Sequence, residues 1–290
     1  MNSFFEYDFL TRALLAGLAL GVACGLLSPW VVLRRLSFSA DGLAHSSLGG
    51  LALGVVLLRS GPVPTLAGYG ISFLFTCGVA LLIAYIAGKN WLQSDTAVGA
   101  CYVAAFALGV LLLSLQRRSG HLEHFLFGSL LSVTPLEVQL LTGLVGLTAL
   151  ANYCGWRWLG SWTFDEELAR AGRVPTAVLR YGLMLLIAAT VILATWIVGI
   201  LLVTALLILP GATGVLAGRT LRGIAALSVS AAVGAVLAGM AVSNQVDVPP
   251  GPTIVLSAFT VFAVAFGWRR WRDARRASEQ NFSTPDSHVH

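Results

Sequence analysis

The 290-residue chain is 57% hydrophobic and only 11% charged, whereas soluble globular domains carry about 25% charged residues. This composition excludes an ordinary soluble domain and predicts an all-α, polytopic helical membrane protein. The formal net charge of +5 does not indicate nucleic acid, because most arginines lie in short loops and in the C-terminal tail, as the positive-inside rule expects. The cysteines are scattered without a close pair, which argues against a disulfide framework or a thiolate zinc site.

Hydrophobic runs long enough to cross a bilayer, which takes about 20 residues, follow one another along most of the chain. Ser37 or Ser39 can cap the second run. The run 176–209 is too long for one crossing and just long enough for two short ones, with a soft break near 195–199. We therefore expect eight or nine transmembrane helices, from the runs 10–33, 37–58, 65–87, 96–115, 136–154, 176–209, 223–242 and 253–268.

Polar segments between these runs set the expected domain boundaries and orientation. Segment 125–133 is apolar but too short to span, so it is predicted to be re-entrant or interfacial. Segment 155–173 is the most polar interior stretch, and 277–290 is predicted to be a disordered cytoplasmic tail behind a single transmembrane domain, 1–276. With nine crossings, most arginines fall on the cytoplasmic side, which places the N-terminus outside and the C-terminus inside. Three arginines disagree with this orientation: Arg59, Arg117 and Arg118.

The second run contains an acidic and a basic side chain that share one helix face. Asp41 and His45 are four residues apart, the spacing that stacks two side chains on a helix. Ionisable groups inside a membrane are costly and indicate function, and a carboxylate with an imidazole can bind a divalent cation. His45 lies about 15 Å deeper than Arg35, near the midplane of a hydrocarbon core about 30 Å thick. The alternative is that Asp41 caps the helix and His45 hydrogen-bonds a neighbouring helix.

Two further places hold residues that can bind a cation. His121, Glu123 and His124 form a His-x-Glu-His motif in an outer loop, for which a solvated loop is the favoured interpretation and a metal entrance the alternative. Asp247 stands beside a Pro-Pro pair, and we interpret it as structural in the outer loop, with lining of the entrance as the alternative.

Five motifs occur in order along the chain. The first is Arg34-Arg35-Leu36-Ser37-Phe38 followed by Asp-Gly-Leu-Ala-His at 41–45. The others occupy 127–134, 164–172, 198–213 and 247–252. Together they resemble the zinc/manganese/iron permease family of ABC importers, the membrane subunits of bacterial metal-uptake systems. The resemblance covers 10–266 and implies a fold similar to the ABC-3 and cobalamin-type importer permeases.

The resemblance also implies residue roles and partners. Asp41 and His45 match the pair implicated in handling the metal on the translocation path. A coupling role toward the ATPase is implied for Pro210, Gly211, Ala212, Thr213, Arg219 and Arg222. The implied partners are a second copy of the chain, two cytoplasmic ATPase subunits, an extracytoplasmic metal-binding protein and the lipid of a bacterial inner membrane, with no nucleic acid.

The cargo implied by the resemblance is a divalent cation, zinc first and manganese or iron(II) second. Ala44 before His45 is closer to the zinc-type branch, because serine is usual there in the manganese-type branch. Ser129 replaces the aspartate that is usual in the central motif. No permanent cofactor is expected.

The sequence lacks a Gly-x-x-x-x-Gly-Lys-[Ser/Thr] motif, so ATP hydrolysis is expected on partner subunits and the chain itself is not expected to be an enzyme. The alternatives are a secondary transporter or channel that works without ATP and, more weakly, a membrane enzyme.

Overall fold

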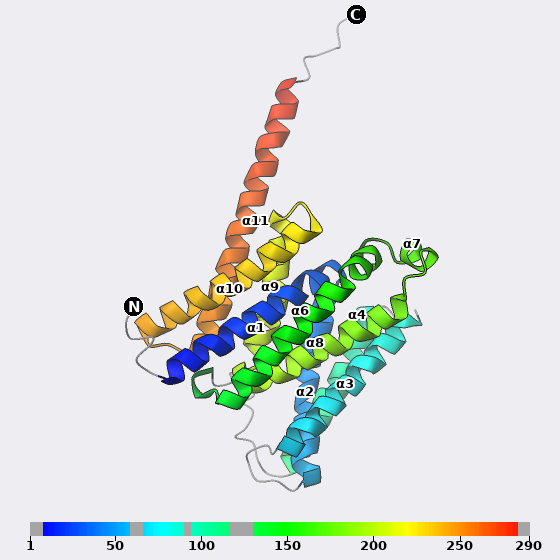
Figure 1. The fold of residues 1–290 in the computed structure, drawn as a ribbon, viewed down its shortest axis with the longest axis vertical. Coiled ribbons are helices and arrows are strands. Elements are labelled where there is room, and N and C mark those ends of the chain that lie inside the picture. The colour runs from blue at the N-terminus through cyan, green and yellow to red at the C-terminus, as the bar shows by residue number, and fades with distance from the viewer. Residues whose placement is uncertain (1–7, 59–65, 90–93, 116–129, 284–290) are drawn as a thin grey trace, which may run out of the picture.

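The computed structural model describes residues 8–58, 66–89, 94–115 and 130–283, and the regular elements of these ranges are all helical (Figure 1). They are α1 (Asp8–Leu33), α2 (Ser37–Leu58), α3 (Leu66–Gly88), α4 (Ser94–Leu115), the 3-10 turn η3 (Leu130–Ser132), α6 (Pro135–Phe164), α7 (Glu166–Ala171), α8 (Thr176–Val198), α9 (Ile200–Ala217), α10 (Leu221–Val246) and α11 (Pro250–Ser283). Nine helices within these ranges are long and apolar enough to cross a membrane. The all-α polytopic prediction is confirmed, with the larger of the two expected numbers of spans.

The helices form two groups that α8 joins (Figure 1). In one group α1 packs against α6, α9 and α10, and α11 lies against α9 and α10. In the other group α2 packs between α3 and α4, and α8 contacts α3 and α2 as well as α9 and α6. The core between them consists of large aliphatic side chains without exposed surface, among them Leu20, Leu27, Leu43, Ile187 and Leu206.

A single glycine separates α8 from α9 inside the long apolar run. Gly199 has φ 87° and ψ 161°, a conformation that residues with a side chain rarely adopt. Its amide donates to the carbonyl oxygen of Thr195 at 3.0 Å, which closes α8 before a new helix starts at Ile200. The break predicted near 195–199 is therefore confirmed, and the run forms two candidate spans.

Two helices extend further than the hydrophobic runs that predicted them. α6 continues to Phe164 instead of ending at 154, because the added residues are mostly apolar and Arg157 is their single charge. α11 continues to Ser283, so residues 277–283 are helical where a disordered tail was expected. This part of α11 contains Ala277, Glu279 and Gln280, which are strong helix formers whether or not they are apolar. The last seven residues lie outside the described part of the chain.

α9 also passes through Pro210, where the sequence predicted an end. Pro210 and Gly211 are buried, and the Gly211 amide donates to Ser28 Oγ of α1 at 2.6 Å. A proline inside a helix removes one backbone hydrogen bond and bends the helix, and α1 carries its own internal proline, Pro29. A Cβ added at Gly211 would collide with the backbone of Ser28. The two helices therefore cross closely at this glycine, which belongs to the packed core.

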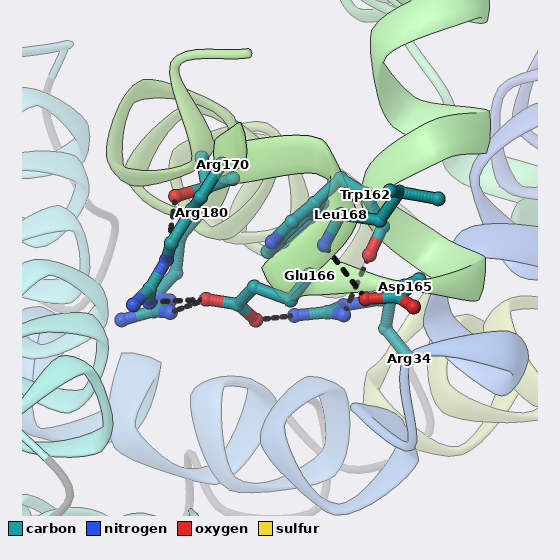
Figure 2. Close-up of polar contacts among 8 residues, drawn as sticks. Arg34, Trp162, Asp165, Glu166, Leu168, Arg170 and Arg180 are labelled. Carbon is teal, nitrogen blue, oxygen red and sulfur yellow. Dashed lines mark hydrogen bonds and ion pairs between the residues drawn. The ribbon is translucent and has the colours of Figure 1, made fainter. Parts of the chain in front are cut away.

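Just beyond the C-terminal end of α1, Glu166 of α7 forms ion pairs with three arginines (Figure 2). Its Oε2 accepts a hydrogen bond from Arg34 at 2.9 Å, and its Oε1 accepts from Arg170 at 2.7 Å and from Arg180 at 2.5 Å. The Arg34 guanidinium also lies 3.7 Å from the ring centroid of Trp162, a cation–π contact.

The Glu166 cluster fixes α7, which has only six residues and is too short to be stable by itself. Arg34 belongs to the junction between α1 and α2, and Arg180 to α8, so one carboxylate ties α7 to three membrane-crossing helices. Burial opposes ionisation of Glu166, but the hydrogen bond from Arg34 and the charge of Arg180 outweigh it. The pKa of Glu166 is therefore lowered below its ordinary value of 4.5.

Gly211→Ala is expected to lower the melting temperature of the purified protein, because the added methyl group overlaps Ser28. Overpacking a well-packed core costs about 1–3 kcal/mol. The matched control is Gly234→Ala in α10, where an added Cβ meets nothing within 4 Å, and this variant should not melt earlier. A Gly211→Ala protein as stable as the wild type would contradict the close crossing of α1 and α9.

Glu166→Gln is expected to lower the melting temperature as well, because the neutral amide leaves three arginines without a counter-charge. Hydrogen bonds to charged groups contribute about 1.5–3 kcal/mol. Glu167→Gln changes the exposed neighbouring carboxylate and serves as the control.

The wild type and Glu166→Gln also test whether Glu166 is ionised. Because its pKa is lowered in the folded state, the carboxylate stabilises the fold fully above pH 4.5 and loses this effect as the pH falls below that value. The difference in melting temperature between wild type and Glu166→Gln should therefore shrink on acidification below pH 4.5. A difference that stays constant would contradict an ionised, arginine-bound Glu166.

Candidate functional site

α2 lies close to its neighbours because small residues line the contacts. A Cβ added at Gly42 would meet the side chain of Val98 in α4, and one added at Gly50 would meet the backbone of Ser72 in α3. Close approach through small residues is the usual way that helices pack in lipid, where water supplies no driving force between them. The packing against α3 and α4 leaves an edge of α2 only partly covered, and Asp41 and His45 lie on it.

The structure brings Asp41 and His45 together as the sequence predicts. His45 Nε2 lies 3.8 Å from Asp41 Oδ1, and the two side chains are 31% and 41% exposed, respectively. This separation is too long for a hydrogen bond, so the two side chains do not hydrogen-bond to each other. A cation with ligand bonds of about 2.0–2.2 Å could take one atom from each side chain after a small rotation.

Two aromatic residues of α4 orient the imidazole of His45. The ring of Phe106 meets it edge-on, with centroids 5.8 Å apart, and the ring of Tyr102 lies at 6.2 Å. Sequence reasoning missed both, because α4 reads as a uniformly apolar run. The four-residue spacing of Tyr102 and Phe106 could have indicated them, because it places both side chains on one face of α4.

The described part of the chain supplies too few donors for a complete metal site. Within the described residues, no group of three or more His, Cys, Asp or Glu side chains is close enough to hold a metal ion. Asp41 and His45 therefore offer two of the four to six donors that zinc, manganese or iron(II) take. A complete site at this pair needs further donors from beyond the described residues, such as water or a second chain.

Asp247 does not join this pair. Asp247 is exposed, adopts a left-handed conformation (φ 55°, ψ 48°) and ends α10 by donating its amide to the carbonyl oxygen of Ser243. This geometry agrees with the structural role expected for it. Four residues singled out in the sequence lie outside the described part of the chain: His121, Glu123, His124 and Ser129.

The expected coupling segment needs a correction, because most of it is not on the surface. Its first half continues α9 and packs into the core, with Pro210, Gly211 and Thr213 buried and Ala212 partly buried. The basic half, Arg219 and Arg222, is exposed at the turn into α10. The sequence predicted a helix end at Pro210, but the apolar residues on both sides of the proline pack against α1 and keep α9 intact.

A second exposed feature lies at the same end of the bundle as this turn (Figure 1). Phe164, at the end of α6, and Leu168, in α7, are 72% and 71% exposed. Leu168 lies outside the candidate spans, and a large apolar side chain this exposed there indicates a surface that meets another protein. The sequence motif at 164–172 included both residues, but only the tertiary structure shows that α7 protrudes.

Comparisons with known proteins agree with this architecture. A model of the ABC 3 transport family matches residues 6–269. A manganese transport system membrane protein, MntC of Halalkalibacterium halodurans, is 33% identical over 285 residues, which are 95% of each chain. A chelated iron transport system membrane protein, YfeD of Yersinia pestis, is 31% identical over 261 residues, 90% of this chain and 86% of the relative.

Solved structures show the same fold. PsaBC from Streptococcus pneumoniae, solved in complex with Fab, superposes with a TM-score of 0.78 at 29% identity, covering 91% of this chain and 93% of that chain. A metal-chelate type ABC transporter in an inward-facing conformation superposes with a TM-score of 0.71 at 18% identity, which supports the fold alone. The family match across nearly all spans, together with relatives of similar length, establishes that the chain belongs to the ABC 3 transport family.

Proposed function

We propose that this chain is the membrane permease subunit of an ABC importer for a divalent metal ion, and that Asp41 and His45 bind the ion during its passage. One observation carries the proposal. A carboxylate and an imidazole share one face of a membrane-crossing helix, are partly exposed, and make no hydrogen bond with each other. An ion can thus reach both groups without breaking a hydrogen bond between them.

The exposed edge of α2 supports a homodimer. An acidic side chain in a membrane helix is costly when it faces lipid, so this edge needs a polar cover. A second copy related by a twofold axis would bring its own Asp41 and His45 to the same place. The shared site would then have two carboxylates and two imidazoles, enough for a transient metal site.

Manganese and iron(II) are the first ions to test, with zinc as their competitor. The relatives compared above are named for manganese and chelated iron, whereas the residue before His45 favours the zinc-type branch. Carboxylate oxygens suit manganese, and imidazole nitrogens suit zinc and iron. The mixed donor set accepts all three ions, so competition in an uptake assay has to rank them.

The surface formed by α7 and the turn holding Arg219 and Arg222 is the proposed docking site for the ATPase subunits. Phe164 and Leu168 offer apolar contacts there. Glu166 connects α7 directly to Arg34, which is close in the chain to Ser37, where α2 begins. A displacement of α7 by the ATPase would therefore reach the helix that carries Asp41 and His45.

The expected orientation belongs to the same proposal. The arginines of the α1–α2 junction, of α7 and of the α9–α10 turn lie at one end of the bundle, which the positive-inside rule places in the cytoplasm of a bacterial inner membrane. The N-terminus then lies outside, the C-terminus lies inside, and an extracytoplasmic metal-binding protein delivers the ion at the opposite end.

Asp41→Asn and His45→Ala are expected to reduce metal uptake at least about tenfold, because even outer-sphere partners of a metal change affinity by 10- to 100-fold. The measurement is uptake of radioactive manganese, and then of iron(II) and zinc, in cells that lack their own importer. Asp95→Asn, which removes an exposed carboxylate at the start of α4, is the control and should keep wild-type uptake. Normal uptake by Asp41→Asn with normal expression would refute the site.

Leu168→Asp is expected to abolish association with the ATPase subunit and ATP-dependent uptake, because it places a charge in an apolar contact. The melting temperature should stay unchanged, since the side chain is 71% exposed. Leu168→Met keeps an apolar side chain of similar volume and should restore both activities. Uptake that continues in Leu168→Asp cells after ATP depletion would instead favour a secondary transporter.

A further inference from the structure

A groove between α9 and α11 lies outside the proposed transport and docking surfaces. It has a volume of about 320 Å³ and is lined on the α9 side by Leu216 and Ala217 and on the α11 side by Val264, Trp268 and Arg272, among others. The two helices run in the same direction along the groove (Figure 1). Apart from Thr213 and Arg272, the residues that line the groove are apolar. Arg272 lies at the end of the groove nearest the cytoplasmic side.

The length of α11 places this groove at the membrane surface. From Pro250, where α11 begins, Trp268 lies about 27 Å along the helix axis at 1.5 Å per residue. A hydrocarbon core is about 30 Å thick, so Trp268 reaches the interface, where tryptophan is enriched. Arg272 follows one helical turn later, at the depth of the lipid headgroups.

The guanidinium of Arg272 has an unused donor. Its Nε is shielded from solvent and has no hydrogen-bond partner among the described residues. Two neighbouring cations are engaged, since Arg269 pairs with Asp273 at 3.8 Å and Arg275 lies 3.8 Å from the ring centroid of Trp271. A shielded N–H without a partner is costly, and a guanidinium binds phosphate oxygens strongly.

The charge around the groove is positive. Arg219, Arg222, Arg269, Arg270, Arg272 and Arg275 belong to this end of α9, α10 and α11, and Asp273 is the acidic residue among them. Basic clusters directly cytoplasmic of a membrane helix attract acidic lipids. The groove also opens toward lipid, because Val264 is 67% exposed and Trp268 is 61% exposed.

We propose that this groove binds an acidic phospholipid of the cytoplasmic leaflet. One acyl chain lies along Leu216 and Val264, and the phosphate accepts hydrogen bonds from Arg272. The combination of an apolar wall, one cation with a shielded and unpaired donor, and the depth of the headgroups fits this ligand. A soluble anion would leave the apolar wall uncovered, and a zwitterionic lipid would leave the positive charge uncompensated.

The proposal is tested by native mass spectrometry of the purified permease titrated with phosphatidylglycerol or with phosphatidylethanolamine. The wild type is expected to retain phosphatidylglycerol in preference to phosphatidylethanolamine. Arg272→Gln should bind it about fivefold more weakly, the loss expected for one arginine near a charged lipid surface. Arg157→Gln removes an exposed charge from α6, which does not line the groove, and its binding should change by less than about twofold on the same scale.

A second variant tests the apolar part without altering charge. Ala265→Leu narrows the groove and should displace phosphatidylglycerol while the protein stays monodisperse. Glycerol 3-phosphate, a headgroup without acyl chains, should not be retained by the wild type.

Three results would overturn the proposal. The first is equal retention of the two lipids by the wild type. The second is undiminished phosphatidylglycerol binding by both Arg272→Gln and Ala265→Leu. The third is an Ala265→Leu protein that still binds phosphatidylglycerol but no longer associates with a second copy or with the ATPase subunit. The groove would then be a contact between proteins.

Discussion

The cost of placing an ionisable side chain inside hydrocarbon is the constraint on which this structure depends. Asp41 and His45 lie on a membrane-crossing helix, and neither is satisfied by the other. Glycines pack α2 against α3 and α4, and Tyr102 and Phe106 support the imidazole. The proposed passage of a metal ion would give these partly exposed groups a ligand.

Several helices of this protein pack through close backbone contacts at small residues, where a soluble protein would use bulky apolar side chains. The crossing of α1 and α9 depends on Gly211, Pro210 and the hydroxyl of Ser28, which accepts the hydrogen bond from the Gly211 amide. The contacts of α2 depend on Gly42 and Gly50. In lipid, close approach of backbones gains dispersion and hydrogen bonding that hydrophobic burial cannot supply. Small residues therefore determine which helices are neighbours.

Arginines organise the cytoplasmic end in a different way. Glu166 concentrates three of them around one carboxylate, and its lowered pKa keeps this cluster charged at neutral pH. The cluster joins a protruding six-residue helix to the junction that precedes α2. The proposed ATPase surface and the proposed metal site are thus connected by a short series of direct contacts, while α11 carries a separate basic surface toward the lipid.

The sequence by itself determined the membrane class, the positions of the spans, the break at Gly199 and the pairing of Asp41 with His45. These follow from hydropathy, glycine conformation and helical periodicity, which act within one segment. It misplaced the ends of α6, α9 and α11, and it could not assign α7, Tyr102, Phe106 or Arg272 a role. Helix ends near Pro210 and contacts such as Glu166 with Arg34 were decided only by the tertiary structure. The reason is that they depend on the fit between segments far apart in the chain, where packing and charge pairing override local preference.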